Sequence, residues 1–229
     1  MGNAHLKRLA APKTWHVNRK KIKFITKPAP GPHSLQNGIA LGTLIKEILG
    51  YASTTREAKK MMHTDEIKVD GKARKDFRFP VGIFDTLEFA KTGECFRVIL
   101  NKNGKIGVIK ISREEFNVKP CKIIGKKMIK GHIQLNLHDG KNIIVDKDSY
   151  KIGDTVILKL PGQEISKHIK MDKKAAIFLI GGNHIGEIGN VDDIIQNKII
   201  YRDQKNNLIE TSKEYSFVVG DSKPLIGLE

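Results

Sequence analysis

The sequence has few cysteines, few aromatic side chains and no long apolar run. It contains two cysteines and one tryptophan among 229 residues, and aromatic residues make up 6% of the chain. Two distant cysteines, Cys95 and Cys121, exclude a disulfide framework and leave no second pair for a zinc site. The longest apolar run, residues 175–180, is far shorter than the roughly 20 residues that span a bilayer. Collagen-like and membrane-spanning proteins are thereby excluded.

Sorting signals are also missing. No apolar stretch follows the N-terminal charges, so no secretory signal is predicted. Leu6 stands where a myristoylation signal needs Ser or Thr. We therefore expect a soluble protein of the cytoplasm.

Acidic residues are absent from residues 1–40, which hold eight Lys and Arg. The whole chain has 41 Lys and Arg against 25 Asp and Glu, a net charge of +16. The excess of basic over acidic residues is small in residues 41–92 and large again in residues 93–172, and residues 173–229 have no such excess. Such a balance indicates a polyanionic partner, with nucleic acid favoured over an anionic membrane.

Residues 1–40 are predicted to form an extended basic arm. Prolines near its end favour an extended chain, and like charges repel one another. We expect the arm to order on RNA phosphates, with Trp15, His16 and Phe24 as base-stacking surfaces. A disordered solubilising tail or a nuclear-import patch is the alternative. The arm residues expected to bind RNA are Lys7, Arg8, Lys13, Trp15, Arg19, Lys20, Lys21 and Lys23.

Residues 41–92 predict two helices followed by a hairpin. Apolar residues at 41, 44, 45 and 48 have helical spacing, and Gly50 ends that helix. Thr54 and Glu57 form a capping box for the second helix, and Asp70-Gly71 predicts a tight turn. The second helix carries a basic stripe without an acidic residue, which favours contact with RNA or DNA over a merely solvated face. The stripe consists of Arg56, Lys59, Lys60 and His63.

The segment 41–89 resembles a small RNA-binding domain found in ribosomal proteins, pseudouridine synthases and tyrosyl-tRNA synthetases. The resemblance rests on residues 54–62 (TTREAKKMM) and 67–72 (IKVDGK). In that family the second helix and the hairpin form the RNA surface. Asp70 replaces the Asn more commonly seen before the turn glycine. The resemblance implies phosphate or sugar contacts by Thr55, Arg56, Lys59, Lys60, Lys68 and Lys72.

Residues 93–172 predict short strands separated by turn signals, typical of a small β-barrel or sandwich. Lys126 and Lys127 lie in a basic stretch, for which phosphate contact and surface solubility both remain open. Asp146 and Asp148 do not complete a calcium loop, because a further oxygen ligand and a glycine are missing.

The segment 173–229 opens with a buried strand over 175–180 and a glycine-rich loop, GGNHIGEIG. A nucleotide phosphate loop is excluded because Gly186 is followed by Glu187. Two interpretations of the glycine-rich loop remain open: a tight hairpin in a barrel and a loop that contacts a partner. Residues 174–201 resemble a KOW motif with Gly186 as its central glycine. The resemblance implies structural roles for Gly182 and Gly186, and RNA or protein contact by Asn183 and His184.

The order of these parts resembles the archaeal and eukaryotic type of small-subunit ribosomal protein four. Residues 5–15 (HLKRLAAPKTW), 31–33 (GPH) and 217–220 (FVVG) carry this likeness, and the short C-terminus fits an archaeal member. The resemblance implies an α+β multidomain chain. Its parts are a basic N-terminal arm (1–40), an RNA-binding helix-pair and hairpin domain (41–92), a central β-barrel-like domain (93–172) and an SH3-like KOW barrel (173–229).

No enzyme is predicted, because the common hydrolase, metalloprotease and phosphate-loop motifs are absent. The resemblance implies a ribosome-associated, structural constituent of the small ribosomal subunit that binds and organises rRNA in translation. Its partners are rRNA and neighbouring small-subunit proteins, with no membrane, cofactor, metal or small-molecule substrate. The alternative is a KOW-containing transcription or translation factor that binds RNA transiently.

Overall fold

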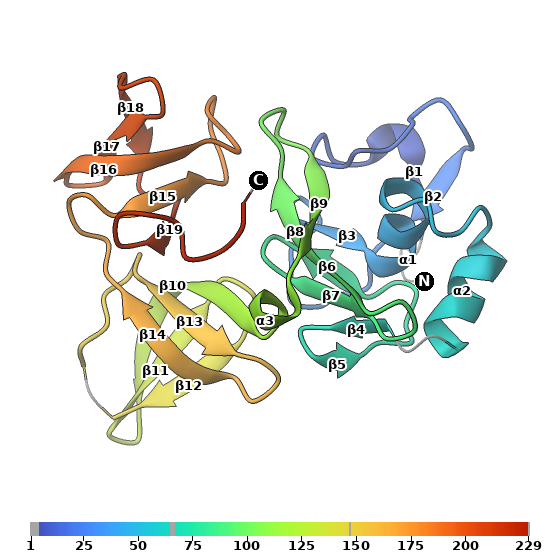
Figure 1. Cartoon of the computed structure of the whole chain (residues 1–229), viewed down its shortest axis with the longest axis horizontal. Coiled ribbons are helices and arrows are strands. Elements are labelled where there is room, and N and C mark those ends of the chain that lie inside the picture. The colour runs from blue at the N-terminus through green and yellow to red at the C-terminus, as the bar shows by residue number, and fades with distance from the viewer. Residues whose placement is uncertain (1–4, 65–66, 147, 229) are drawn as a thin grey trace. The chain divides into compact units, whose positions relative to one another are not determined.

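The computed structural model in Figure 1 describes residues 5–64, 67–146 and 148–228. The chain is mostly β with few helices and divides into two compact units. Unit 1 contains the residues up to 99 together with 105–117, and unit 2 contains 100–104 and the residues from 118 onward. The structure thus confirms a multidomain chain, while the boundaries of the four predicted parts stay a prediction. None of the described helices is long and apolar enough to cross a membrane.

Unit 1 is built on a five-stranded sheet in the order β5-β4-β7-β8-β9, with two smaller pairs, β1-β2 and β3-β6. Its elements are β1 (His5–Lys7), η1 (Arg8–Ala10), β2 (Phe24–Thr26), β3 (Gly38–Ala40), α1 (Leu41–Thr43), η2 (Leu44–Ile48), α2 (Thr55–Thr64), β4 (Ile67–Val69), β5 (Lys72–Ala73), β6 (Pro80–Gly82), β7 (Thr86–Phe89), β8 (Glu94–Leu100), β9 (Ile106–Ile111) and α3 (Arg113–Phe116).

The first predicted helix is short and changes its winding. Leu41, Leu44 and Ile45 are fully buried, as their helical spacing predicts. From residue 44 the helix is π-helical, with the Leu49 N–H donating to the Leu44 carbonyl at 3.0 Å. Gly50 then adopts φ +70°, a conformation that a glycine adopts without strain, and ends the helix.

The second helix, α2, begins at the predicted capping box. The Thr54 hydroxyl accepts a hydrogen bond from the Glu57 N–H at 3.2 Å, and the Glu57 carboxylate accepts from the N–H groups of Ser53 and Thr54. These bonds satisfy N–H groups that have no partner inside the helix. They lower the pKa of Glu57. The capping-box prediction is confirmed.

The N-terminal segment packs on unit 1, which corrects the expectation of an extended arm. Trp15 is 1% exposed, and its indole Nε1 donates to the Gly38 carbonyl at 3.0 Å. Arg8 is also 1% exposed and donates to the two carboxylate oxygens of Glu47 at 2.7 and 2.6 Å. The hydrogen bonds to Glu47 raise the pKa of Arg8. A carboxylate outside the segment and a few buried apolar side chains therefore offset the repulsion within it.

Unit 2 contains two five-stranded sheets, in the orders β12-β11-β10-β13-β14 and β18-β17-β16-β15-β19. β15 is buried along its whole length, as its composition predicts. The strands are β10 (Val118–Ile129), β11 (His132–Leu137), β12 (Asn142–Val145), β13 (Thr155–Lys159), β14 (Glu164–Ile169), β15 (Ala176–Leu179), β16 (Ile188–Ile195), β17 (Lys198–Asp203), β18 (Leu208–Ser212) and β19 (Ser216–Gly220).

A buried lysine joins the two sheets of unit 2. Lys122 on β10 donates from its Nζ to the carbonyls of Lys213, Glu214 and Ser216 at 3.0, 2.9 and 2.6 Å. The three acceptors match the three N–H bonds of an ammonium group. Burial lowers the pKa of Lys122 to about 8, opposed by the Glu214 carboxylate. Lys122 thus has a structural role, although it lies in a stretch rich in basic residues.

The pair of Arg8 and Glu47 yields a prediction about the N-terminal segment. Glu47→Gln leaves a buried guanidinium without its carboxylate, which costs about 3–5 kcal/mol. We expect the segment to loosen, so that acrylamide quenches the fluorescence of Trp15 more strongly. Because Trp15 is the single tryptophan of the chain, the signal reports on this segment alone.

Glu114→Gln is the control for this measurement. It removes the same charge from an exposed position on α3 and is expected to change stability by less than about 0.5 kcal/mol. Equal quenching in the wild type and in Glu47→Gln would contradict the structural role of the pair.

Candidate nucleic-acid interface

The basic stripe of α2 lies on the surface. Arg56, Lys59, Lys60 and His63 are exposed, while the opposite face of the helix packs inward. The Lys59 Nζ also lies 5.8 Å from the centre of the Phe77 ring, a cation–π distance. The helix therefore presents four side chains that can be positively charged to the solvent.

The hairpin after α2 adds one exposed lysine and one paired lysine. Asp70 and Gly71 have φ values of +51° and +74°, which fits the predicted tight turn. Lys72 is exposed, whereas the Lys68 Nζ lies 3.2 Å from a Glu88 carboxylate oxygen. A lysine that already has a carboxylate partner contributes less to binding a phosphate. Thr55 lies exposed at the start of α2.

The residues predicted in the N-terminal segment separate into two groups. Arg8 and Trp15 are buried, so neither is available to RNA, and this corrects their assignment. Arg19 directs its guanidinium to the carbonyls of Leu9, Ala11 and Pro12. The exposed members are Lys7, Lys13, Lys20, Lys21 and Lys23.

Of the two rings Trp15 and Phe24 predicted as stacking surfaces, Phe24 is the exposed one. It is 47% exposed, and its ring centre lies 5.7 Å from that of His5. The Lys23 Nζ lies 5.5 Å from the same ring. An accessible aromatic ring beside cationic side chains is the usual arrangement for stacking a base.

A cavity of about 310 Å³ adjoins Phe24 within unit 1. Sequence reasoning did not single out its basic side chains, because residues far apart in the chain contribute them. The lining includes Phe24, Lys27, Lys46, Thr55, Phe77 and Arg78.

In unit 2, the predicted lysines of β10 differ in their environment. Lys126 forms an ion pair with Asp148 and donates to the Tyr150 carbonyl at 2.7 Å, so protein atoms already hold it. Lys127 is exposed. Of the two, Lys127 is the one available to an external phosphate.

The glycine-rich loop before β16 combines an exposed amide with an imidazole held in place. Asn183 is exposed, while the His184 Nδ1 lies 3.1 Å from a Glu187 carboxylate oxygen. Gly182 and Gly186 have φ values of +81° and +80°. Side chains are strained at such angles, so both glycines suit the conformation of the loop.

Gly186 also lies against another segment of unit 2. A Cβ atom added at Gly186 would lie 2.6 Å from the carbonyl carbon and oxygen of Asn101 and 2.8 Å from the Lys102 nitrogen. These are backbone atoms and cannot rotate away. The loop thus needs a glycine both for its φ angle and for this close approach.

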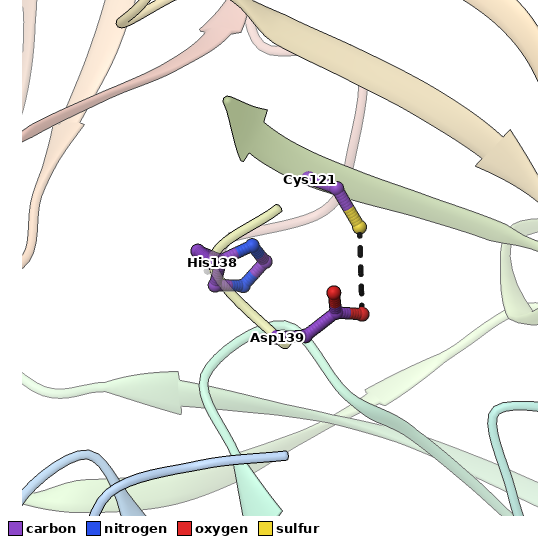
Figure 2. Close-up of side chains that lie close together, drawn as sticks. All are labelled: Cys121, His138 and Asp139. Atoms are coloured by element: carbon purple, nitrogen blue, oxygen red, sulfur yellow. Dashed lines mark hydrogen bonds between the residues drawn. The ribbon is translucent and has the colours of Figure 1, made fainter. Parts of the chain in front are cut away.

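Cys121, His138 and Asp139 lie close enough together to resemble a metal site (Figure 2). The Cys121 Sγ–H donates to an Asp139 carboxylate oxygen at 3.7 Å. The Lys119 and Lys141 ammonium nitrogens lie 3.1 and 3.0 Å from the same carboxylate. The two ammonium groups already neutralise the Asp139 carboxylate and would repel a bound metal ion. The cluster therefore fits a buried ion network better than a metal site.

The electrostatics of this network agree with its geometry. Burial alone would raise the pKa of Asp139, but the Lys119 and Lys141 ammonium groups outweigh burial and hold that pKa far below its ordinary value. The His138 ring packs edge-on against Phe217, with ring centres 5.2 Å apart. The cluster therefore stabilises the start of the β11–β12 turn.

Comparisons with known proteins bear on the whole chain. Residues 92–165 match the ribosomal family S4e, and residues 2–36 match the RS4NT (NUC023) domain. The chain is 39% identical to small ribosomal subunit protein eS4 of Aeropyrum pernix, covering 99% of this chain and 96% of that protein. The protein of the same name from Methanococcus aeolicus is 39% identical, over 98% and 97% of the two chains. The chain belongs to the ribosomal family S4e.

A solved structure supports the fold of this S4e protein. The crystal structure of the 30S ribosomal protein S4e from Thermoplasma acidophilum is 30% identical and gives a TM-score of 0.72. The match covers 81% of this chain and 96% of that one. The family resemblance predicted from the N-terminal and C-terminal motifs is confirmed, and so is the archaeal likeness, since the relatives named here are archaeal. Because S4e is a family of structural ribosomal proteins, the prediction that the chain is not an enzyme is confirmed as well.

The close approach at Gly186 yields a second prediction. Gly131→Ala places a side chain at φ +86° with no atom within 4 Å, and we expect it to cost about 1 kcal/mol. Gly186→Ala adds a collision with the Asn101 backbone, and we expect about 3 kcal/mol in total. Denaturant unfolding of the full-length protein measures both costs. An equal loss of unfolding free energy in the two variants would show that the close approach carries no energy.

The buried network yields a third prediction. Asp139→Asn leaves the Lys119 ammonium buried without that carboxylate, at a cost of about 3–5 kcal/mol, and adding Lys119→Met is expected to recover much of it. A lowered pKa means that Asp139 stabilises the fold above its unfolded pKa of about 3.9 and that this contribution is lost as the pH falls further.

Denaturant unfolding of unit 2 between pH 5 and pH 2 measures this difference. We expect a steeper loss of stability on acidification in the wild type than in Asp139→Asn. Stabilisation of the wild type by added Zn²⁺ would instead identify the cluster as a metal site.

Proposed function

We propose that this S4e protein binds rRNA in the small ribosomal subunit through the exposed basic side chains of unit 1. As a family member it is a structural constituent of the small subunit, associated with cytoplasmic ribosomes and acting in translation without catalysis. The main support for this RNA-binding surface is the basic stripe of α2. Three lysine or arginine side chains lie on one exposed helix face, with none of them in an ion pair with a described residue.

The residues proposed to contact rRNA are those whose charge faces solvent. Around the α2 stripe they are Lys7, Lys13, Lys20, Lys21, Lys23, Thr55 and Lys72, with Lys68 and Arg19 in a weaker role. In unit 2 they are Lys127 and Asn183, with Lys126 and His184 contributing less because carboxylates already hold them. Phosphate contacts of this kind fix position on RNA without reading its sequence.

We further propose that the sheet β18-β17-β16-β15-β19 is an SH3-like KOW barrel. Its support is the order of a buried strand, a glycine loop with two positive φ angles, and a following strand paired antiparallel to the first. The small RNA-binding domain proposed for residues 41–92 rests on the capped helix and the Asp-Gly hairpin.

Membership of the S4e family favours the structural constituent over the alternative predicted from the sequence, a KOW factor that binds RNA transiently. Sedimentation through high salt separates the two functions. A structural constituent stays with the small subunit, whereas a transient factor is released into the supernatant.

The α2 stripe yields a fourth prediction, measured as binding of the full-length protein to small-subunit rRNA at several salt concentrations. Replacing Arg56, Lys59 and Lys60 by Ala removes three exposed charges. Each lost phosphate contact lowers the slope of log K against log salt by about 0.7–0.9, so we expect a decrease of about 2–3.

The matched control removes three exposed lysines from unit 2, where the final segment has no net positive charge. Lys174, Lys205 and Lys223, which like the stripe residues form no ion pair with a described residue, are replaced by Ala; this changes the net charge equally and is expected to leave the slope nearly unchanged. An equal decrease in both variants would mean that total charge, and not the stripe, determines affinity.

A further inference from the structure

The cavity of unit 1 has the size and the walls of a site for one nucleotide. Its volume of about 310 Å³ lies at the lower end for small-ligand sites, so it has room for one nucleotide and not for a duplex. Side chains from β1, β2, η2 and the start of α2 line it, together with Phe77 and Arg78. Secondary structure thus holds most of its walls in place.

Part of the lining is aromatic and apolar. Phe24 exposes about half of its surface, and His5 packs beside it at 5.7 Å. Ile22, which is also exposed, lines the same cavity. An open aromatic ring on a strand is the kind of surface on which RNA-binding proteins stack an unpaired base.

The lining also carries positive charge. Lys27, Lys46 and Arg78 line the cavity, and the Arg78 Nε–H donates to the Lys27 carbonyl at 3.2 Å. The single carboxylate in the lining, Glu47, has both oxygens engaged by Arg8. The cavity therefore attracts an anion such as a phosphate, because the one negative charge of its lining is already neutralised by Arg8.

The cavity also adjoins the α2 stripe. Phe77 lines the cavity, and the Lys59 ammonium lies over the same ring. At the start of α2 the Glu57 carboxylate accepts from the N–H groups of Ser53 and Thr54, and its negative charge opposes an anion there, so the helix N-terminus does not supply the anion site. An RNA strand held by the stripe is thus next to the mouth of the cavity.

We propose that this cavity receives one unstacked nucleotide of single-stranded RNA, with its base on Phe24 and its phosphate at Lys27, Lys46 and Arg78. The proposal rests on the proposed rRNA binding and adds that the protein selects unpaired RNA at this point. A nucleotide in a duplex cannot enter, because its base stays stacked between its neighbours.

The test uses the full-length protein and two single-stranded RNA octamers, one intact and one with a central run of abasic nucleotides. Both carry the same number of phosphates, so they differ only in the bases offered for stacking. Stacking of one base by an aromatic side chain corresponds to roughly 5- to 150-fold in affinity. We expect the wild type to prefer the intact octamer by at least about 5-fold.

Variants at the aromatic and at the basic lining residues test the assignment. Phe24→Leu is expected to lose the preference, and Phe24→Tyr to keep it, because only the second retains a ring. Lys46→Met is expected to weaken both octamers alike. Tyr215→Leu, which removes an exposed ring from unit 2, is the control and should keep the preference. Fluorescence of the buried Trp15 reports that each unit 1 variant remains folded.

The outcomes distinguish this proposal from the proposed function. Salt-dependent binding of both octamers with equal affinity would overturn the nucleotide site and leave rRNA binding intact. No RNA binding by the wild type would overturn both. Adenosine monophosphate bound as tightly as the intact octamer would identify a free nucleotide as the ligand, and a duplex bound with the same Phe24 dependence would refute selection of unpaired RNA.

Discussion

The buried pair of Arg8 and Glu47 is the interaction on which the RNA-facing surface of unit 1 depends. It connects the start of the chain to the π-helical turn η2, 39 residues away, with two short hydrogen bonds. A buried pair is weak evidence for added stability, since both charges lose their hydration. Here the pair acts by placing residues: it holds the basic N-terminal segment against η2 despite the repulsion among its charges. It also neutralises Glu47, the one carboxylate that lines the cavity.

Local features were predictable from the sequence, and contacts between distant residues were not. The capping box of Thr54 and Glu57 and the Asp70-Gly71 turn involve neighbours within four residues, so short-range chemistry determines them. The burial of Trp15 depends on the carbonyl of Gly38 and on a bridge to Ile106. Gly38 lies 23 residues from Trp15 and Ile106 lies outside residues 1–40. The composition of residues 1–40 shows neither contact, so it predicted an extended segment.

Unit 2 shows the same division between local and distant constraints. The positive φ of Gly186 follows from the loop itself, but its contact with the Asn101 backbone joins segments that are 85 residues apart in number. Likewise, Cys121, His138 and Asp139 have the elements of a ligand set, and the two lysines beside Asp139 decide against it. Proximity of ligand atoms is therefore insufficient, and the charges around them determine what the cluster can bind.

Exposure, more than total charge, decides which basic residues can serve RNA. The net charge of +16 counts Lys122, whose ammonium is taken by three carbonyls, and Arg8, whose guanidinium is taken by Glu47. Such groups cannot neutralise an RNA phosphate, so they displace none of the counterions condensed on the RNA. The lysines of α2 face water and keep that capacity. Affinity for rRNA thus depends on the basic side chains that the fold leaves exposed to solvent. Selectivity depends on an exposed aromatic ring beside them, such as Phe24.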